Sequence, residues 1–307
     1  MPQLVLKVDV DTYRGTLIGV PRLIELLRWH GAGATFLFSL GPDHTGRAIK
    51  RAFRPGFLSK VSRTSVLSHY GFKTLMYGIL LPGPDIGRRC VDVLRSAAAA
   101  GFETGIHCWD HIRWQDGVRQ ADRPWTEREM VLAARRYASV FGTAAKVHGA
   151  AGWQMNAHAL RLTHDLGFTH ASDCRGRGPF LPVWDGDLVM VPQLPTTLPT
   201  LDELIGVGGV DETNVHDCLL SLTSAAPAGG HVYTLHAELE GMKLLPVFEK
   251  LLVGWRQQGY SLLTLQEQRA ALKPAALPHH EVVWGSVPGR SGELMVQGPE
   301  SVSDRSC

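Results

Sequence analysis

The sequence predicts an α/β fold in which parallel strands form a (β/α) barrel. Short segments rich in β-branched and aromatic residues alternate with amphipathic segments of helical spacing along most of the chain. In addition, polar side chains suited to chemistry follow several of the expected strands. Because the carboxyl ends of parallel strands meet on one face of a barrel, we expect these side chains to converge there.

The first strand–helix–strand unit occupies the N-terminal forty residues. Residues 4–8 form an apolar strand that leads into Asp9-Val10-Asp11, two carboxylates separated by one residue. A polar loop is expected at 12–15. Leucines at helical spacing then predict a helix over 20–30, which ends at a glycine, and residues 34–40 have the β-formers of a buried strand.

The remaining elements continue this alternation to about residue 272. The expected helices are 88–100, 126–141, 156–166, 211–225, 243–258 and 266–272, and the first residues of 126–141 have the spacing of a capping box. The expected strands are 102–106, 144–147, 168–171, 188–194, 231–235 and 260–265. From residue 274 the pattern fades, and we expect a tail that wraps the surface or is partly disordered.

Residues 44–84 differ in composition from the rest of the chain. They contain no Asp or Glu, many large apolar residues and seven basic residues: Arg47, Lys50, Arg51, Arg54, Lys60, Arg63 and Lys73. Basic charge among apolar side chains suits a surface for anionic lipid. An ordinary helical insertion with solvated charges has the same composition, and the residue types alone favour that second interpretation.

Composition places limits on the function. The formal net charge of +2 gives no reason to expect nucleic acid as a partner. The five cysteines are scattered without CxxC spacing, which favours reduced thiols in the cytosol. The N-terminus enters a strand directly, so we expect no secretory signal, and no apolar run reaches the length of a membrane helix.

A histidine pair follows the strand expected at 102–106. His107 and His111 are four residues apart, and a helical turn between them would place both imidazoles on one face, able to bind one metal ion. Two neutral imidazoles leave room for a carboxylate and for water, which a hydrolytic site requires. Asp9 and Asp11 are candidates for that carboxylate. Cys108 is a lesser candidate, because its side chain would point away from the shared face.

The joint placement of these motifs predicts a metal-dependent hydrolase. Asp-x-Asp also occurs in turns and caps, HxxxH occurs by accident on surface helices, and a single histidine is more often structural. Yet five groups fall at expected strand ends: Asp9/Asp11, His107/His111, His148, Asp173/Arg175 and His236. The GxSxG turn of serine hydrolases and the GxxxxGK[ST] phosphate loop are both absent from the sequence.

These motifs resemble the polysaccharide deacetylase (NodB-like, carbohydrate esterase) family over residues 1–270. The resemblance rests on Asp9-Val10-Asp11, the His107-x-x-x-His111 pair and Leu235-His236. It implies a deformed (β/α) barrel with one divalent metal ion. The implied ligands are Asp11, His107 and His111, with Asp9 as general base and His236 as general acid. Zn, Co, Mn and Ni all suit this ligand set.

Two features depart from the usual pattern of the family. Many members have an Arg-x-Pro segment where this chain has His148-Gly149-Ala150, so the arginine that steadies the base is absent there. We expect Arg175 to take its place and Asp173 to orient His236. A residue also separates the two aspartates, which are adjacent in many members, and this leaves the division of base and ligand between Asp9 and Asp11 open.

Within the family, the segments around these motifs and the segment Val283-Trp284-Gly285-Ser286-Val287 are most similar to a deformylase branch. That similarity implies removal of formate from an aminosugar on undecaprenyl phosphate, towards aminoarabinose-modified lipid A and polymyxin resistance. Because such a substrate is attached to a lipid, the interpretation of residues 44–84 as a surface for anionic lipid becomes the favoured one. We then expect contact with anionic lipid or substrate from Lys50, Arg51, Arg54, Tyr13, Trp109 and His148.

Two alternatives stay open at this point. One is an N-deacetylase of another aminosugar, in a glycan or peptidoglycan. The other is a non-catalytic, metal-stabilised protein that binds the lipid carrier. We expect residues 1–272 to form the metal-dependent domain, interrupted by the insertion at about 44–84, and 273–307 to form the tail. The expected location is the cytoplasm, peripherally on the inner membrane.

Overall fold

The structure is a computed structural model that describes residues 1–48 and 72–301. Its centre is a curled sheet in the order β5-β4-β3-β2-β1-β8, with β9 also paired to β1, and every pairing in it is parallel. The strands are β1 (Gln3–Val10), β2 (Thr35–Ser39), β3 (Glu103–Cys108), β4 (Val147–His148), β5 (His170–Ala171), β8 (His231–His236) and β9 (Ser261–Leu263). The predicted α/β class with a parallel, barrel-like sheet is confirmed.

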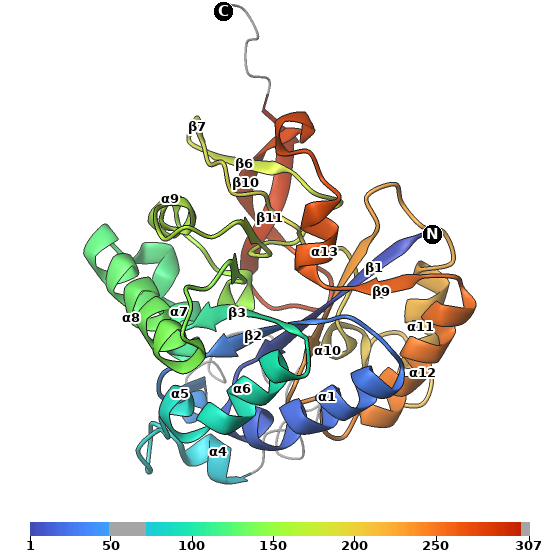
Figure 1. The fold of residues 1–307 in the computed structure, drawn as a ribbon, viewed down its shortest axis with the longest axis horizontal. Coiled ribbons are helices and arrows are strands. Elements are labelled where there is room, and N and C mark those ends of the chain that lie inside the picture. Colours follow the sequence, from blue (N-terminus) through green and yellow to red (C-terminus); the bar gives the residue numbers. More distant parts are fainter. Residues whose placement is uncertain (49–71, 302–307) are drawn as a thin grey trace, which may run out of the picture.

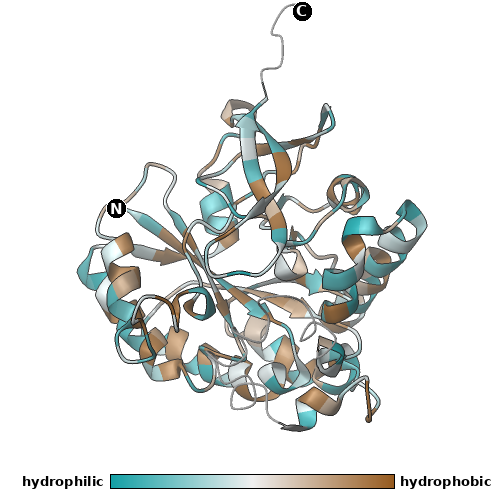
Figure 2. Ribbon diagram, turned by 180° about the vertical axis from the view of Figure 1, so that it is seen from behind, coloured by the Kyte–Doolittle hydropathy of each residue, from teal (hydrophilic) through white to brown (hydrophobic). Residues whose placement is uncertain are grey.

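Helices surround this sheet and cover its outer face (Figure 1). Each long helix carries both polar and apolar residues, as expected for a helix with one face on a core (Figure 2). In chain order they are the π-helix η1 (Gly15–Gly19), α1 (Val20–Trp29), α4 (Phe72–Met76), α5 (Ile86–Arg89), α6 (Val91–Ala99), α7 (His111–Gly117), α8 (Arg123–Phe141), α9 (Ala157–Asp165), α10 (Leu201–Leu204), α11 (Val215–Leu222), α12 (Leu245–Gln257) and α13 (Leu265–Ala270). Short 3₁₀ turns are η3 (Val118–Gln120), η4 (Ala151–Trp153) and η5 (Pro274–Ala276).

Several element boundaries differ from the prediction for local reasons. The loop expected at 12–15 is helical from residue 13 onward. The capping box expected at Thr126 is wrong, because α8 begins three residues earlier, where the Asp122 side chain accepts a hydrogen bond from Trp125 N at 2.9 Å. The strand expected at 188–194 shrinks to β7 (Asp187–Leu188), and β6 (Leu181–Trp184) was not expected.

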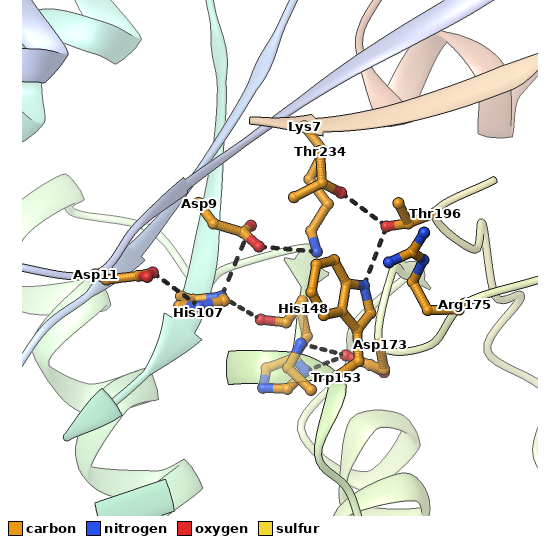
Figure 3. A network of polar contacts seen from close by, with 12 residues as sticks. Lys7, Asp9, Asp11, His107, His148, Trp153, Asp173, Arg175, Thr196 and Thr234 are labelled. Atoms are coloured by element: carbon orange, nitrogen blue, oxygen red, sulfur yellow. Dashed lines mark hydrogen bonds and ion pairs between the residues drawn. The ribbon is translucent and has the colours of Figure 1, made fainter. Parts of the chain in front are cut away.

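The alternation of side chains along β1 separates the core from the inside of the curled sheet. Leu4, Leu6, Val8 and Val10 belong to the main hydrophobic core. The residues between them face the other way: Val5 joins a small inner cluster with Leu37, Val147, Leu194, Val232 and Leu265. Lys7 and Asp9 follow Val5 on that inner face (Figure 3). One residue between Asp9 and Asp11 therefore keeps both carboxylates on the inside.

An irregular segment, residues 192–197, joins the two outer edges of the sheet. On the β5 side, Ala171 N donates to Pro192 O at 2.9 Å and Leu194 N donates to Ala171 O at 2.7 Å. On the β8 side, Thr197 N donates to Val232 O at 3.0 Å. The backbone groups that an open edge would leave unpaired are thus partly satisfied, and the inside of the sheet is enclosed.

The expected tail contains regular structure that the sequence pattern did not reveal. β10 (His279–Ser286) and β11 (Glu293–Glu300) pair antiparallel, and β10 also pairs with β6 in a second sheet of order β11-β10-β6-β7. β11 contacts the loop after β5, because Arg175 N donates to Met295 O at 2.9 Å and Gln297 N donates to Arg175 O at 2.8 Å. The hydrophobic residues of each strand form one short run, 282–284 in β10 and 294–296 in β11, without the alternation that predicts a half-buried strand.

One buried acid on the outer side of the sheet allows a stability prediction. Glu129 in α8 is 1% exposed, and neither of its carboxylate oxygens has a hydrogen-bond partner in the described part of the chain. Burial raises the pKa of Glu129, while Arg113, at 3.4 Å, opposes that rise. A raised pKa means that this carboxyl group favours folding while protonated and that the benefit is lost as the pH rises through the folded-state pKa.

We therefore expect Glu129→Gln to gain stability relative to wild type as the pH increases. Between about pH 5 and about pH 8 the difference in free energy of unfolding should grow by about 1 kcal/mol, because glutamine carries no charge to bury. Urea unfolding at several pH values measures this. Glu127→Gln, at an exposed position of the same helix, is the control and should show no such trend. A constant difference for Glu129→Gln would contradict the prediction.

Candidate metal centre

Asp11, His107 and His111 come together at the carboxyl ends of β1 and β3. Asp11 Oδ1 lies 3.2 Å from His107 Nε2, and Asp11 Oδ2 lies 3.4 Å from His111 Nε2. One ligand atom from each residue fits within 4.8 Å of the others, as a shared metal ion requires. The helical turn expected between the histidines is absent: His107 belongs to β3, and His111 is the first residue of α7.

The histidine pair meets because the chain turns sharply between β3 and α7. The side chain of Asp110 caps α7 by accepting from Arg113 N at 3.1 Å. This cap starts the helix immediately after the strand and brings the His111 ring to 5.3 Å from the His107 ring. Cys108, the lesser ligand candidate, faces the opposite side of β3, where its Sγ lies 3.3 Å from Ser39 Oγ.

The donor atoms of this cluster fit a metal ion. His107 Nδ1 donates to Gly149 O at 2.6 Å, since a carbonyl oxygen can only accept, and this leaves the lone pair of Nε2 directed at Asp11. Asp11 Oδ1 has no hydrogen-bond partner among the described residues. Two lone-pair atoms at 3.2 Å repel each other, and a cation between them would remove that repulsion.

Asp11 and the histidines of the cluster shift one another's pKa. Burial alone would raise the pKa of Asp11, but the neighbouring His111 and His107 outweigh it and hold that pKa well below its ordinary value. Burial alone would lower the pKa of His107, but Asp9 and Asp11 outweigh it and raise that pKa. The cluster thus attracts positive charge, whether as protons or as a metal ion.

Asp9 and His236 lie beside this cluster on neighbouring strands. Their Cα atoms are paired in the β1–β8 register, and Asp9 Oδ1 is 3.8 Å from His107 Nδ1. His236 Nδ1 is buried without a hydrogen-bond partner in the described residues, and the His236 backbone N–H donates to Glu240 Oε2 at 2.9 Å. A carboxylate and an imidazole therefore lie close to the candidate metal ligands, and their roles as base and acid stay a prediction.

Two glutamates after β8 support the site, and the sequence analysis gave them no role. Glu238 Oε1 accepts hydrogen bonds from Asp11 N at 3.0 Å and from Thr12 N at 2.7 Å, which fixes the chain at the end of β1. A Cβ at Gly15 would lie 2.0 Å from that same oxygen, so a glycine is needed there. In the sequence, Glu238 and Glu240 lie within four residues of His236, and this proximity indicates that they could support the site.

His148 and Asp173 differ from the prediction. His148 Nδ1 lies 2.6 Å from Asp173 Oδ1, and the second Asp173 oxygen accepts from Gln193 Nε2 at 2.9 Å. Asp173 therefore orients His148 and not His236. Because Val147 faces the inner cluster, the next residue of β4 points outward, where the His148 ring lies 6.3 Å from Trp114. An imidazole on that side of the sheet is remote from the substrate contact expected of it.

Arg175 also has a different setting from the expected one. Its Nη1 donates to Glu203 Oε1 at 2.6 Å and its Nη2 donates to Leu198 O at 2.9 Å. These polar contacts are with residues that follow the irregular segment 192–197. The cation beside the Asp9 carboxylate is instead Lys7, at 3.2 Å (Figure 3). Lys7 is the one charged residue among the apolar residues 4–8, and a charge at such a position indicates a buried partner.

The remaining predicted contacts lie at the edge of the site or outside the described chain. Tyr13 N donates to Asp43 Oδ2 at 2.9 Å, and Trp109 O accepts from Gly41 N at 2.8 Å, so both residues border the loop after β2. Their contact with a substrate stays a prediction. Lys50, Arg51 and Arg54 fall in 49–71, outside the described residues.

Comparison with known proteins identifies relatives along nearly the whole chain. A protein of Shewanella sediminis (strain HAW-EB3) is 36% identical over 299 residues, 95% of this chain and 93% of its own. A protein of Wigglesworthia glossinidia brevipalpis is 31% identical over 289 residues, 92% of this chain and 98% of its own. Both carry the name probable 4-deoxy-4-formamido-L-arabinose-phosphoundecaprenol deformylase ArnD. No family model matches the chain.

Solved structures show the same fold at low sequence identity. A Mycobacterium smegmatis protein assigned as a polysaccharide deacetylase has a TM-score of 0.62 at 15% identity, over 93% of this chain and 96% of its own. A peptidoglycan N-acetylglucosamine deacetylase has a TM-score of 0.51 at 13% identity, over 87% of each chain. These two comparisons show the fold, which is that of polysaccharide deacetylases.

The geometry predicts that His107→Ala loses the metal ion. Removing a ligand should lower the Zn²⁺ affinity by more than about a hundredfold, since loss of a residue that only orients a ligand already costs up to that much. Competition with a chelating dye measures the affinity. His164→Ala, at an exposed position, is the matched control and should bind like wild type. Wild-type affinity in His107→Ala would show that the cluster does not hold the ion.

Proposed function

Because this chain belongs to the 4-deoxy-4-formamido-L-arabinose-phosphoundecaprenol deformylase family, hydrolases of amide C–N bonds with the polysaccharide deacetylase fold, we propose that it is a metal-dependent deformylase. Its substrate is the formamido sugar carried on undecaprenyl phosphate, and its products are formate and the free aminosugar lipid. The single observation that carries this proposal is the Asp11–His107–His111 cluster with Asp9 and His236 beside it.

Asp11, His107 and His111 would hold a divalent ion such as Zn, Co, Mn or Ni, which when bound would supply Lewis acidity towards an amide carbonyl and a water molecule. The Gly149 carbonyl supports this role by holding the proton on His107 Nδ1, which keeps Nε2 available as a ligand.

Asp9 and His236 divide the proton transfers. Asp9 Oδ1 has no hydrogen-bond partner in the described part of the chain and is buried near the cluster, so it can accept a proton from the attacking water. His236 can then donate a proton to the nitrogen of the leaving amine, which is otherwise a poor leaving group. The Glu240 carboxylate binds the His236 backbone N–H and keeps the end of β8 in place for this transfer.

A lipid-linked substrate requires access to a bilayer surface. Within the described residues, no helix has both the length and the apolar character needed to cross a membrane. At the described end of the insertion, Ile79 and Leu80 are apolar and exposed, Leu80 at 77%. The other end is anchored at the site, because His44 Nδ1 lies 2.6 Å from Asp110 Oδ2. This arrangement supports peripheral contact with the anionic, cytoplasmic side of the inner membrane through the insertion.

The product of this reaction has a free amine. A positively charged aminosugar on a lipid carrier is the form that can modify lipid A and reduce its negative charge. We therefore place the chain in the synthesis of aminoarabinose-modified lipid A, and through it in polymyxin resistance. The name of the relatives supports the first part of this assignment, the formamidoarabinose on phosphoundecaprenol from which the amine is formed.

The proposed activity is tested by formate release from the purified formamido-sugar lipid. We expect formate release by the Zn²⁺-loaded protein to be at least about tenfold faster than acetate release from the N-acetyl analogue. A site that fits a formyl group has to accommodate one additional methyl group in the analogue. Asp9→Ala and His236→Ala should keep the metal ion and lose at least about a hundredfold in rate. Exposed Asp165→Ala is the control and should match wild type.

Other outcomes would contradict this proposal in distinct ways. Faster acetate release would indicate a deacetylase. Tight binding of the lipid without release of either acid would indicate a carrier-binding protein, and chelation would then unfold the chain instead of only stopping turnover. Near-wild-type turnover by either variant would remove that residue from the mechanism.

Membrane contact has a separate test. We expect the protein to bind vesicles that contain anionic lipid and to release them as the salt concentration rises, because the attraction is electrostatic. Replacing Lys50, Arg51 and Arg54 together by glutamine should weaken binding, by about 1 kcal/mol for each charge near the surface. Vesicle sedimentation measures both effects. Equal binding by the triple variant would contradict a role for these residues.

A further inference from the structure

The inner face of β1 carries a lysine to which the proposed chemistry gives no role. Lys7 lies two residues before Asp9, on the same face of the strand, and its side chain is fully buried. Its Nζ is 3.2 Å from Asp9 Oδ2 and 5.1 Å from the centroid of the Trp153 ring (Figure 3). Within the described residues, Asp9 is the one ion-pair partner of this ammonium group, and no other acceptor is in hydrogen-bond reach.

Fold stability does not account for a lysine at this position. Moving an ammonium group out of water is costly, and a buried ion pair is often no more stable than apolar residues of the same size. The neighbours on the inner face of the sheet carry no charge: Thr35 and Thr234 pair with Lys7 in register, and Val5 and Leu37 belong to the apolar cluster below. A methionine or leucine would pack there without any charge to bury. The lysine is therefore better explained by what it does to Asp9.

Asp9 needs to be held in one orientation to act as a base. Rotation about the bond to an aspartate carboxyl group is soft, so an unrestrained carboxylate samples many orientations. Lys7 contacts Oδ2, whereas Oδ1 faces His107, 3.8 Å from Nδ1, and has no hydrogen-bond partner in the residues that the structure describes. The ion pair thus holds one oxygen and leaves the other free beside the metal ligands.

The surroundings are shaped to keep Lys7 extended towards Asp9. A Cβ at Gly149 would lie 3.0 Å from Lys7 Cε and 2.3 Å from Leu37 Cδ1, so a side chain there would crowd the lysine. On the other side, the face of Trp153 contributes a cation–π contact. Trp153 is itself fixed, because its Nε1 donates to Thr196 Oγ1 at 3.1 Å and its backbone adopts φ of +54°.

Two further cations hold the Trp153 ring. Arg175 Cζ lies 5.0 Å and Arg290 Cζ 4.3 Å from the ring centroid. Two carboxylates face these two guanidinium groups: Glu203 Oε1 is 2.6 Å from Arg175 Nη1 and 2.5 Å from Arg290 Nε, and Asp202 Oδ2 is 3.9 Å from Arg290 Nη2. Their charge is therefore satisfied away from the base. Lys7 is the cation that reaches the Asp9 carboxylate.

We propose that Lys7 is a positioning residue for the hydrolysis, which fixes the Asp9 carboxylate through Oδ2 and leaves Oδ1 free beside His107. The proposal rests on the proposed function for its kinetic test, but the orientation of Asp9 can be observed without any turnover. Arg175 was expected in this role from the sequence; the geometry assigns it to Lys7.

The test compares Lys7→Met with wild type, using formate release, Zn²⁺ content and thermal unfolding. Methionine is close to lysine in length and lacks the charge. We expect kcat to fall by about a hundredfold, the cost of a misplaced catalytic group, while KM changes less than about threefold. Zn²⁺ content should be unchanged and the unfolding temperature equal or higher. Lys146→Met removes an exposed lysine and should behave like wild type in all three measurements.

A crystal structure of Lys7→Met supplies the readout that is independent of activity. We expect the Asp9 carboxylate to leave the orientation in which Oδ2 faces residue 7. An unchanged Asp9 orientation, or kcat within about twofold of wild type, would overturn the proposal. Loss of Zn²⁺ together with loss of activity would also overturn it, since Lys7 would then be structural. If the wild type itself releases no formate, the proposed function fails, and the Asp9 orientation still decides the role of Lys7.

A second variant covers the case in which Lys7→Met does not fold. Lys7→Ala leaves a space beside Gly149 that propylammonium can enter, whereas 1-propanol fills the same space without charge. We expect propylammonium to raise kcat of Lys7→Ala at least about tenfold and 1-propanol to have no effect. Equal effects of the two additives, or no effect of either, would overturn the proposal.

Discussion

The concentration of negative charge inside the sheet is the constraint on which the rest of the site depends. Asp9 and Asp11 are both buried on the inner face of one strand, so neither can be solvated by bulk water. Each has its own partners: the Lys7 ammonium group contacts Asp9, and the two imidazoles contact Asp11. This division separates a carboxylate with one oxygen free of hydrogen bonds in the described residues from one whose oxygens both face imidazole nitrogens. The two aspartates are separated by one residue, and because side chains alternate along a strand, this spacing places both carboxylates on the inner side.

Much of the fold could be predicted because its signals are local. The strand–helix alternation, the glycines at helix ends and the apolar first strand are each written in consecutive residues, and they confirm the predicted class. The parts that were missed depend on distant contacts. β10 and β11 are held by pairing with each other and by hydrogen bonds to the loop at Arg175, and the segment 192–197 is held by hydrogen bonds to both sheet edges without strand periodicity. No window along the sequence contains those partners.

In the site, too, the residues that follow recognisable strands could be predicted, whereas roles that depend on distant contacts could not. Asp11, His107, His111 and His236 were identified as a group because each follows a recognisable strand. The reason given for the histidine pair was incorrect, since a strand followed at once by a capped helix, and not a helical turn, brings the rings together. His148 and Asp173 were misplaced by the same rule: a two-residue strand offers no pattern that tells which face a side chain takes. Lys7 has meaning only once Gly149 and Trp153, each more than a hundred residues away, are seen beside it.

The pairing of β1 has a consequence for how the chain is made on the ribosome. Asp9 emerges first, yet its strand neighbour β8 ends at His236, and the arginine that packs on Trp153 is residue 290. Contacts of such long sequence separation form slowly and late, after almost all of the polypeptide has been released from the exit tunnel. Until then β1 can pair with β2, but its other edge, where β8 and β9 pair in the finished fold, stays open to association with other chains. The hydrolytic centre is therefore among the last parts of the molecule to mature, and a truncated translation product would carry the motifs without any chemistry.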